Sequence, residues 1–411
     1  MAQITYKGMN KKGQHTFSIR VSDGYGADGR QRKKSLTWTA PPGMGESKAR
    51  KEAEKEAVRF GDAVKAGTVF DSRVKFEDFA ERWMNEYAKI QLKTKTWTEY
   101  EKQLVRINQS IGHKRLKDIR TPHLNTFYKN LQEDGLNRHT GGKLSPSTVR
   151  IYHRLISSIL GKAVKWGYIP YNPAANAELP KLERKEAAYL DEADARRLLR
   201  LLHKEPVLWR TLVTFDLLSG LRRGELLGLR WQDCDFDHET IRIVETVNYT
   251  TTHGIFTDKP KNHTSIRPIK LSRSAFALLR EYKAYQDGQR IRLGDYWKGT
   301  GRVFTAEDGG HIHPDSLTRW FATFIKRSGL PKVSVHSLRH TYASLMIADG
   351  IPLVVVSRRL GHAQVSTTSN IYSHVIQDAD EKAAQVSERF ADDITPGPVK
   401  GKSGKHITLA S

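Results

Sequence analysis

The chain has 411 residues, which is too many for one ordinary hydrophobic core, so we expect two or three domains. It carries 68 Lys and Arg residues against 45 Asp and Glu residues, a formal net charge of +23. A surplus of this size indicates a polyanionic partner, with nucleic acid as the first choice and loose binding to RNA or acidic surfaces as the alternative. The only cysteine, Cys234, excludes an internal disulfide and a Cys-rich zinc finger, and fits a reducing compartment.

The amino-terminal stretch MAQITYKGMNKKG contains no apolar region of the secretory type. No apolar run along the chain approaches the ~20 residues that a membrane span requires. We therefore expect an intracellular protein without a membrane partner.

Residues 1–68 predict a small domain made of a β-sheet and one helix. Residues 16–24 and 35–40 alternate apolar and polar side chains as the strands of a meander do, and residues 46–67 repeat apolar side chains at helical spacing. A sheet backed by one helix can lay basic strands into a DNA groove, and the alternative is a solvated domain whose charges contact nothing. The expected DNA contacts are Arg20, Arg32 and Lys33.

Residues 75–170 predict a compact bundle of four amphipathic helices. The helix over 76–87 carries an apolar stripe that begins at Phe76. Another helix is expected to start with Thr121 as its N-cap and to stop at Gly135, and the last starts with Ser145 as its N-cap. The polar faces carry basic side chains that either follow DNA phosphates or are only solvated, among them Lys93, Lys95 and Arg150.

Residues 171–189 are rich in Pro, Ala and Asn and then in charge, which predicts a linker, and a larger mixed domain follows over 190–392. Asp191 is expected to cap its first helix, and the nearly all-apolar segment 206–220 predicts a buried helix. Residues 241–249 and 265–272 are strand-like and flank the loop TDKPKNHT. The small polar residues of 393–411 predict a disordered tail.

Four segments of the last domain carry the candidate chemistry. They are SGLRRGELLGLRW (219–231), HSLRHTYAS (336–344), LGH (360–362) and TTSNIYSH (367–374). In their order and spacing they resemble the catalytic signature of the tyrosine recombinase, or phage integrase, family. The resemblance extends by architecture to a helical, SAM-like core-binding domain over 75–180. Residues 1–68 resemble the arm-binding domain of integrases from conjugative transposons and temperate phages.

The chemistry of DNA strand cleavage explains why these residue types are needed. The transition state carries extra negative charge on the non-bridging phosphate oxygens, and guanidinium groups match those oxygens in charge and geometry. The resemblance assigns this clamp to Arg222 and Arg339 and the nucleophile to Tyr372, which would form a 3′-phosphotyrosyl bond. It makes His336 a proton-handling residue and His362 a hydrogen-bond partner of the phosphate.

The leaving 5′ oxygen needs a general acid, which in the family is a lysine at a β-hairpin turn. The loop here offers Lys259 and Lys261, and Lys261 fits the usual offset from the following strand better. The segment departs from the family pattern because no Thr or Gly follows the lysine and because Pro268 interrupts the strand.

Neighbouring residues of the motifs have less direct interpretations. Arg223 is either structural or a DNA-phosphate contact, because it points away from its neighbour on the helix. Glu225 is expected to orient an arginine. His340 belongs to the family pattern but not to its chemistry, and we expect it to pack or cap. His311 and His313 follow no metal-ligand pattern such as H-E-x-x-H, so no metal site is expected.

We therefore expect a multidomain fold, mainly α with small β elements, in which a β-sheet plus helix domain and a helical domain precede a mixed α/β catalytic domain. The resemblance implies a recombinase that integrates or excises a mobile element through a Holliday junction, without metal, ATP or another cofactor. The expected partners are double-stranded DNA attachment sites, a homotetramer, an excisionase and a host DNA-bending protein, in a bacterial cytoplasm near the nucleoid. The alternatives are a type IB topoisomerase and a non-catalytic DNA-binding regulator.

Overall fold

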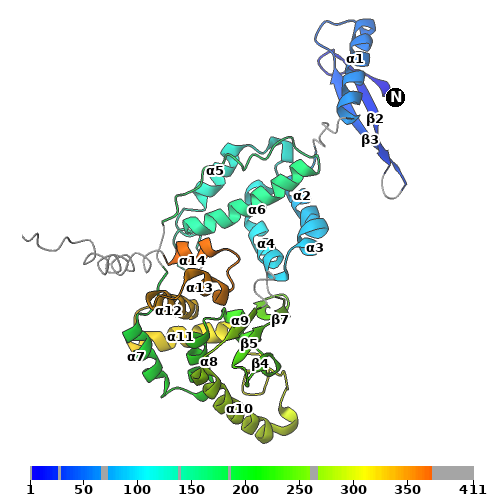
Figure 1. Cartoon of the computed structure of the whole chain (residues 1–411). Helices are drawn as coiled ribbons and strands as arrows, with labels where there is room; N and C mark the ends of the chain where they lie inside the picture. Colours follow the sequence, from blue (N-terminus) through cyan, green and yellow to red (C-terminus); the bar gives the residue numbers. More distant parts are fainter. Residues whose placement is uncertain are drawn as a thin grey trace, which may run out of the picture. The chain divides into compact units, whose positions relative to one another are not determined.

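The computed structural model describes residues 2–25, 29–65, 73–137, 140–183, 187–259 and 267–372. The chain divides into two compact units, Met1–Glu183 and Arg184–Ser411 (Figure 1). The first unit contains a β-sheet with one helix and, after residue 72, a set of helices, whereas the second mixes helices with small sheets. The predicted class, multidomain and mainly α with small β elements, is confirmed.

The amino-terminal sheet is antiparallel and has one face covered by a helix (Figure 1). Phe17, Ile19 and Val21 alternate along the central strand and are buried, because they face the apolar residues of the helix. The first strand was not predicted; it is an edge strand in which Ile4 pairs with Ile19. The elements are β1 (Gln3–Met9), β2 (His15–Tyr25), β3 (Gln31–Thr39) and α1 (Glu46–Lys65).

The helical part has a core built from the predicted aromatic stripe, with Phe76, Phe79 and Trp83 each at most 1% exposed. Two helices continue into a π-helical turn, and Ser145 caps the last helix by accepting a hydrogen bond from Thr148 N at 3.2 Å, as expected. The elements are α2 (Phe76–Trp83), η1 (Met84–Ala88), α3 (Lys89–Gln91), α4 (Thr94–Ile107), η2 (Asn108–Gly112), η3 (Leu116–Asp118), α5 (Thr121–Asn130) and α6 (Pro146–Lys165).

Two expectations for this part are corrected. Thr121 does not cap α5, because its hydroxyl donates to Pro173 O at 2.8 Å, and α5 ends at Asn130 rather than near Gly135. The linker expected over 171–189 is packed in its first part: Ala174 is fully buried in the helical core, and the Arg150 guanidinium donates to Pro180 O at 3.1 Å. The chain therefore leaves the helical domain later than the composition of the segment indicated.

The second unit is organised around a helix that is buried on most of its surface, as predicted for residues 206–220. Asp191 caps the first helix by accepting from Asp194 N at 2.7 Å, also as predicted. A three-stranded sheet has the order β4-β5-β8, and β6 and β7 form a separate hairpin. The elements are α7 (Glu192–Leu202), α8 (Val207–Ser219), α9 (Arg223–Gly228), η4 (Trp231–Asp233), β4 (Cys234–Asp235), β5 (Thr240–Ile243), β6 (Thr246–Thr250), β7 (Gly254–Asp258), β8 (Arg267–Lys270), α10 (Arg273–Leu293), η6 (Gly294–Tyr296), α11 (Pro314–Ser328), α12 (Val335–Ala348), α13 (Leu353–Leu360) and α14 (Val365–Ile371).

The strand expected over 241–249 is in fact two strands, β5 and β6, which belong to different sheets. The chain breaks at Glu245, which forms ion pairs with Arg302 and Arg230. It also passes close to α9, where a Cβ on Gly228 would lie 2.8 Å from Glu245 O. Alternation alone could not reveal this break, because it depends on partners far away in the sequence. Over the part of the chain that the structure describes, no helix has the length and apolarity to cross a membrane.

Candidate active site

The turn between α8 and α9 positions Arg222. Gly220 ends α8 in the left-handed region with φ 61°, and a Cβ there would lie 2.3 Å from the Tyr342 ring, so only glycine fits. Arg222 Nη1 donates to Glu225 Oε1 at 2.7 Å, and its backbone N–H donates to Oε2 at 3.1 Å. The expectation that Glu225 orients an arginine is confirmed. Its side chain is 1% exposed, whereas that of Arg222 is 36% exposed.

Arg339 lies on the second turn of α12 and is buried, with 2% exposure. Its guanidinium donates to Gly220 O at 2.9 Å and to Leu360 O at 2.6 Å. Burial, together with the charge of Arg222, lowers the pKa of Arg339 to about 9. Arg339 therefore remains a cation at neutral pH although no carboxylate is hydrogen-bonded to it in the described residues.

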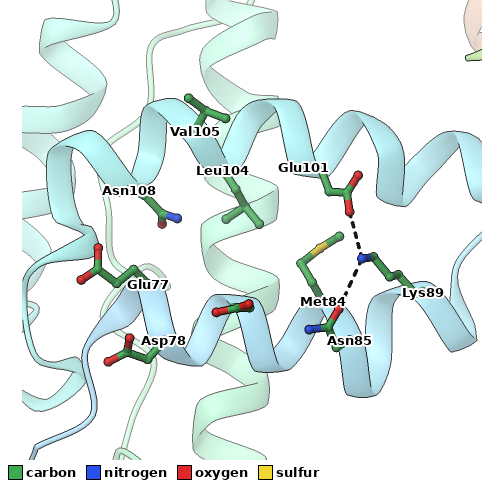
Figure 2. A pocket seen from close by; sticks show the side chains of 10 residues that line it. Glu77, Asp78, Met84, Asn85, Lys89, Glu101, Leu104, Val105 and Asn108 are labelled. Carbon is green, nitrogen blue, oxygen red and sulfur yellow. Dashed lines mark hydrogen bonds and ion pairs between the residues drawn. The ribbon is translucent and has the colours of Figure 1, made fainter. Parts of the chain in front are cut away.

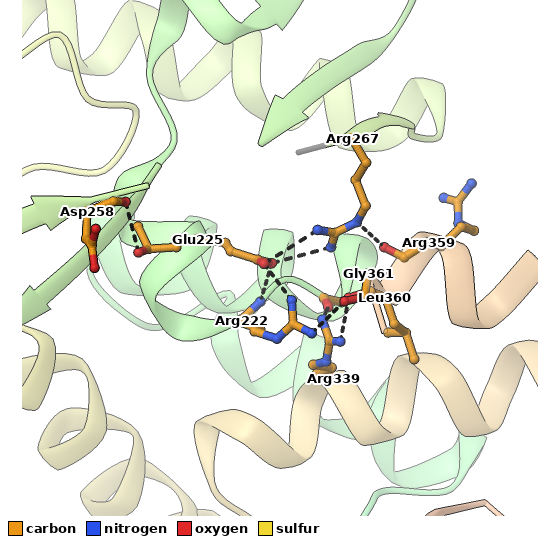
Figure 3. Close-up of polar contacts among 10 residues, drawn as sticks. Arg222, Glu225, Asp258, Arg267, Arg339, Arg359, Leu360 and Gly361 are labelled. Carbon is orange, nitrogen blue, oxygen red and sulfur yellow. Dashed lines mark hydrogen bonds and ion pairs between the residues drawn. The ribbon is translucent and has the colours of Figure 1, made fainter. Parts of the chain in front are cut away.

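Three successive carbonyls at the end of α13 accept hydrogen bonds from three different arginines (Figure 3). Arg267 Nε donates to Arg359 O at 2.7 Å, Arg339 donates to Leu360 O, and Arg222 Nη2 donates to Gly361 O at 2.9 Å. The last carbonyls of a helix lack partners within the helix and carry its negative dipole end, so cations stabilise them.

These hydrogen bonds explain why the LGH segment contains a glycine. Gly361 has φ 66°, and a Cβ there would lie 2.6 Å from Arg267 Nη1. The side chain of Arg267 is 7% exposed and also lies 3.4 Å from Glu225, so Glu225 is shared by two arginines. Arg267 was not predicted as a site residue, although in the sequence it shares one face of a strand with the apolar Ile269 and Leu271.

His336 and His362 lie beside these arginines. His362 Nδ1 lies 2.9 Å from Thr368 Oγ1, and burial with the charges of Arg339 and Arg222 lowers the pKa of His362 to about 4. Partial burial and the charges of Arg339 and Arg222 also lower the pKa of His336, part of whose side chain remains exposed to solvent. Both imidazoles are therefore mainly neutral at pH 7, with one donor and one acceptor nitrogen each.

Tyr372 directly follows α14 and is 1% exposed, packed against Ala343, Val356 and Leu360. Burial raises the pKa of its phenol to about 12, with Arg339 acting in the opposite direction. Its Oη lies 2.9 Å from Nδ1 of His340. The expectation that His340 packs is borne out by its ring contacts with His336 and Tyr372, and its hydrogen bond with the Tyr372 hydroxyl was not predicted.

The structure thus brings five of the six predicted catalytic residues into one region of the second unit: Arg222, His336, Arg339, His362 and Tyr372. The sixth, Lys261, lies outside the described residues, as does the segment that follows Tyr372. The alternative, Lys259, directly follows β7, the second strand of the hairpin.

One buried acid near the site was missed. Asp216 on α8 is 1% exposed, and neither carboxyl oxygen has a hydrogen-bond partner within the described ranges. Burial raises its pKa well above the ordinary value, and the Arg339 charge opposes the shift. The signal was present in the sequence, because an aspartate interrupts an otherwise apolar helix.

The amino-terminal sheet presents a polar face. The register places Arg20 opposite Gln3 and Ser35, out of phase with the buried Phe17 and Ile19, so Arg20 lies on the face opposite α1. Lys33 pairs with Ser22 and is exposed, as is Arg32. This arrangement leaves the three predicted contacts accessible to a ligand.

The other predicted DNA contacts differ in whether the side chain is exposed or hydrogen-bonded within the protein. Lys95 is exposed on the first turn of α4 and Lys93 directly precedes that helix. Arg150 holds the segment after α6, as described above. Arg223 Nη1 donates to Thr318 Oγ1 at 2.6 Å and to Pro314 O at 3.2 Å, so the structural alternative for this residue is supported.

A groove of the helical part is lined by charged side chains that are mainly negative. It lies between the α2–α3 stretch and α4, with Glu77 and Asp78 towards one end and a 3.1 Å ion pair between Lys89 and Glu101 at the other (Figure 2). Carboxylates disfavour phosphate, so this face is a poor candidate for DNA contact. Among the described residues no group of three or more His, Cys, Asp or Glu side chains is arranged to hold a metal ion.

Known proteins resemble this chain in both its helical part and its second unit. Residues 188–378 match the phage integrase family, and residues 75–132 match the phage integrase N-terminal SAM-like domain. A protein named tyrosine recombinase XerC-like from Caldanaerobacter subterraneus is 26% identical over 388 residues, covering 89% of this chain and 94% of that protein. The ICEBs1 integrase of Bacillus subtilis is 26% identical over 276 residues, covering 67% of this chain and 70% of the other.

Solved structures show the same fold. The Tn1549 transposon integrase in complex with circular intermediate DNA aligns with a TM-score of 0.60 at 18% identity, over 73% of this chain and 95% of that one. A lambda integrase tetramer bound to a Holliday junction aligns with a TM-score of 0.52 at 16% identity, over 90% and 94% of the two chains. The motifs, the fold and these relatives agree: the chain belongs to the phage integrase family and is a tyrosine recombinase.

Proposed function

We propose that this recombinase is the integrase of a mobile element, and that it cuts and rejoins DNA at attachment sites through a covalent tyrosine intermediate. One observation above all supports this: Arg339 and Arg222, held on the adjacent carbonyls of Leu360 and Gly361, bring two positive charges together, and the charge of Arg339 acts on the Tyr372 phenol. Two guanidinium groups suit the non-bridging oxygens of one phosphodiester.

In the proposed step, Tyr372 Oη attacks the phosphorus, the bond to the 5′ oxygen breaks, and a 3′-phosphotyrosyl bond remains. The two arginines stabilise the charge that develops on the phosphorane, and a neutral His362 donates a hydrogen bond to it. Lys261 protonates the leaving oxygen, with Lys259 as the alternative. The 5′ hydroxyl of a second strand reverses the step, so no ATP, metal or other cofactor is required.

The buried position of Tyr372 adds a requirement. Tyr372 is 1% exposed, so DNA binding must uncover its phenol before it can reach a phosphodiester. We propose that double-stranded DNA binding, favoured by the net charge of +23, is coupled to this uncovering, in which Tyr372 keeps its contact with His340 of α12.

The larger assembly is proposed by analogy with the relatives. We propose that residues 1–68 bind arm sites through the polar face of the sheet, that 75–170 and 190–392 hold the core site, and that four copies join two duplexes in a Holliday junction. An excisionase and a host DNA-bending protein would set direction, in the bacterial cytoplasm at the nucleoid. The tail after residue 380 would dock on a neighbouring copy, and its deletion should then impair strand exchange more than DNA binding.

The test uses the full chain and duplexes tiled across the DNA on both sides of its gene. Covalent adducts trapped with detergent should map to one short sequence and should form in EDTA. Tyr372→Phe should keep DNA binding and lose adducts, whereas Tyr296→Phe, at an exposed tyrosine of the same domain, should behave as wild type. Adducts that persist in Tyr372→Phe would overturn the assignment of the nucleophile. Cleavage without sequence preference would indicate a topoisomerase instead.

A further inference from the structure

The Tyr372 hydroxyl has one hydrogen-bond partner among the described residues, and it is His340 rather than His336. Oη and Nδ1 are 2.9 Å apart, and the two ring centroids are 5.7 Å apart. The His336 ring stands edge-on to the His340 ring with centroids 4.8 Å apart, so His336 packs against this imidazole. His340 directly follows Arg339 on α12, which places the pair beside the proposed phosphate clamp.

The protonation states of the two groups decide the direction of the hydrogen bond. Burial, with His336 and Arg339 nearby, lowers the pKa of His340 to about 4, so its ring is neutral at pH 7. Burial raises the pKa of Tyr372 to about 12, so the phenol keeps its proton. A neutral imidazole protonated on Nε2 accepts at Nδ1, and the phenol then donates to it. The other tautomer would leave a buried phenol proton without an acceptor, which is costly.

We propose that His340 is a catalytic residue of this recombinase, the general base that removes the phenolic proton of Tyr372. The inference rests on the proposed function of Tyr372 as the nucleophile. As the Oη–P bond forms and the P–O5′ bond breaks, the proton of Oη passes to Nδ1 of His340. The developing negative charge on the phosphorane offsets the positive charge that the imidazole gains beside Arg339. On religation the tyrosine leaves, and His340 returns the proton to it.

The proton must move together with the attack and not before it. His340 is too weak a base, and Tyr372 too weak an acid, to form a stable phenolate–imidazolium pair in the buried site. General bases that act in this concerted way typically accelerate a reaction by about 10²–10⁴-fold. Removing the base should lower the rate of cleavage by such a factor without weakening the binding of DNA.

The first experiment measures single-turnover cleavage by the full chain on the duplex that the trapping experiment identifies. His340→Asn keeps a hydrogen-bonding group near the position of Nδ1 but cannot take up a proton, and His340→Ala removes the group. Both should cleave about 10²-fold more slowly or worse, with unchanged DNA affinity. His203→Asn, at an exposed histidine of the same domain, is the matched control and should cleave at the wild-type rate.

Two further readouts separate a base from a residue that only supports the structure. A duplex with sulfur in place of the leaving 5′ oxygen needs no general acid, so it should rescue Lys261→Ala but not His340→Asn. Imidazole added to His340→Ala should restore cleavage in a saturable way. The rate of His340→Asn should also rise with pH towards the pKa of Tyr372, because hydroxide then has to remove the proton.

The outcomes distinguish this inference from the function on which it rests. Wild-type cleavage by His340→Asn, while Tyr372→Phe forms no adduct, would overturn the role of His340 and leave the nucleophile intact. Rescue of His340→Asn by the sulfur substrate would place its action on the leaving group and also overturn the inference. Adducts in Tyr372→Phe would remove the basis for both.

Discussion

Glu225→Gln tests the network that holds the arginines in place. Glu225 is 1% exposed and contacts Arg222 Nη1 at 2.7 Å and Arg267 Nη2 at 3.4 Å. Burial alone would raise the pKa of Glu225, but the charges of Arg267 and Arg222 outweigh it, and the pKa is lowered. The substitution removes the charge and leaves the buried Arg267 without its carboxylate. Breaking a buried ion pair in this way costs about 3–5 kcal/mol, and because glutamine can still accept a hydrogen bond we expect the lower end, about 3 kcal/mol.

Hydrogen exchange of the buried amides in α8 and α12 measures this loss within the full chain, because those amides report the opening of the catalytic domain alone. A loss of about 3 kcal/mol should speed their exchange by roughly a hundredfold. Glu192→Gln is the control: Glu192 pairs with Arg196 at 2.6 Å, but both side chains are more than 60% exposed, and such pairs contribute about 0.5 kcal/mol. A loss in Glu225→Gln no larger than in Glu192→Gln would refute the account of the network.

The pH dependence gives a second check with a definite sign. Because the folded pKa of Glu225 is below its ordinary value of 4.5, its charge stabilises the fold at every pH above that value. This stabilisation is lost as the pH falls through the folded pKa. The difference in free energy of unfolding between wild type and Glu225→Gln should therefore be constant near neutral pH and should shrink in acid. A difference that grows in acid would contradict the lowered pKa.

Three other substitutions probe separate features. Asp216→Leu should raise the free energy of unfolding at pH 7 by about 1–3 kcal/mol, because it replaces a carboxyl group that is buried without a hydrogen-bond partner by an apolar side chain of the same branched shape; destabilisation would mean that the carboxylate is needed beside Arg339. Gly361→Ala should lower the free energy of unfolding by about 1–2 kcal/mol and slow cleavage, since its Cβ meets Arg267 at φ 66°. Arg20→Ala should reduce the salt dependence of arm-site binding by a slope of about 0.9 if it contacts one phosphate, and an unchanged slope would refute that contact.

Local patterns predicted much of the fold correctly. Ser145 and Asp191 were identified as helix caps because capping depends on a side chain and a backbone amide three residues away. The apolar helix before Gly220 was identified because burial on all sides requires apolar residues on all sides. The expectations failed where a residue far away in the sequence decided the local conformation. Thr121 has the sequence context of a helix cap, but its hydroxyl donates to Pro173 O. The strand over 241–249 breaks because Glu245 pairs with Arg302.

The sequence by itself determined the family, and it predicted the domain order and the candidate reacting side chains, because these follow from residue types at fixed spacings. It could not determine how those side chains are held. Arg222, Arg267 and Arg339 bind three successive carbonyls of residues 359–361, and carbonyl groups are the same for every residue type. Nor could it show which of His336 and His340, which lie one helical turn apart, contacts the Tyr372 hydroxyl. Only the tertiary packing that places Tyr372 among residues of α12 and α13 brought its hydroxyl to His340, because that contact depends on a geometry that no local pattern encodes.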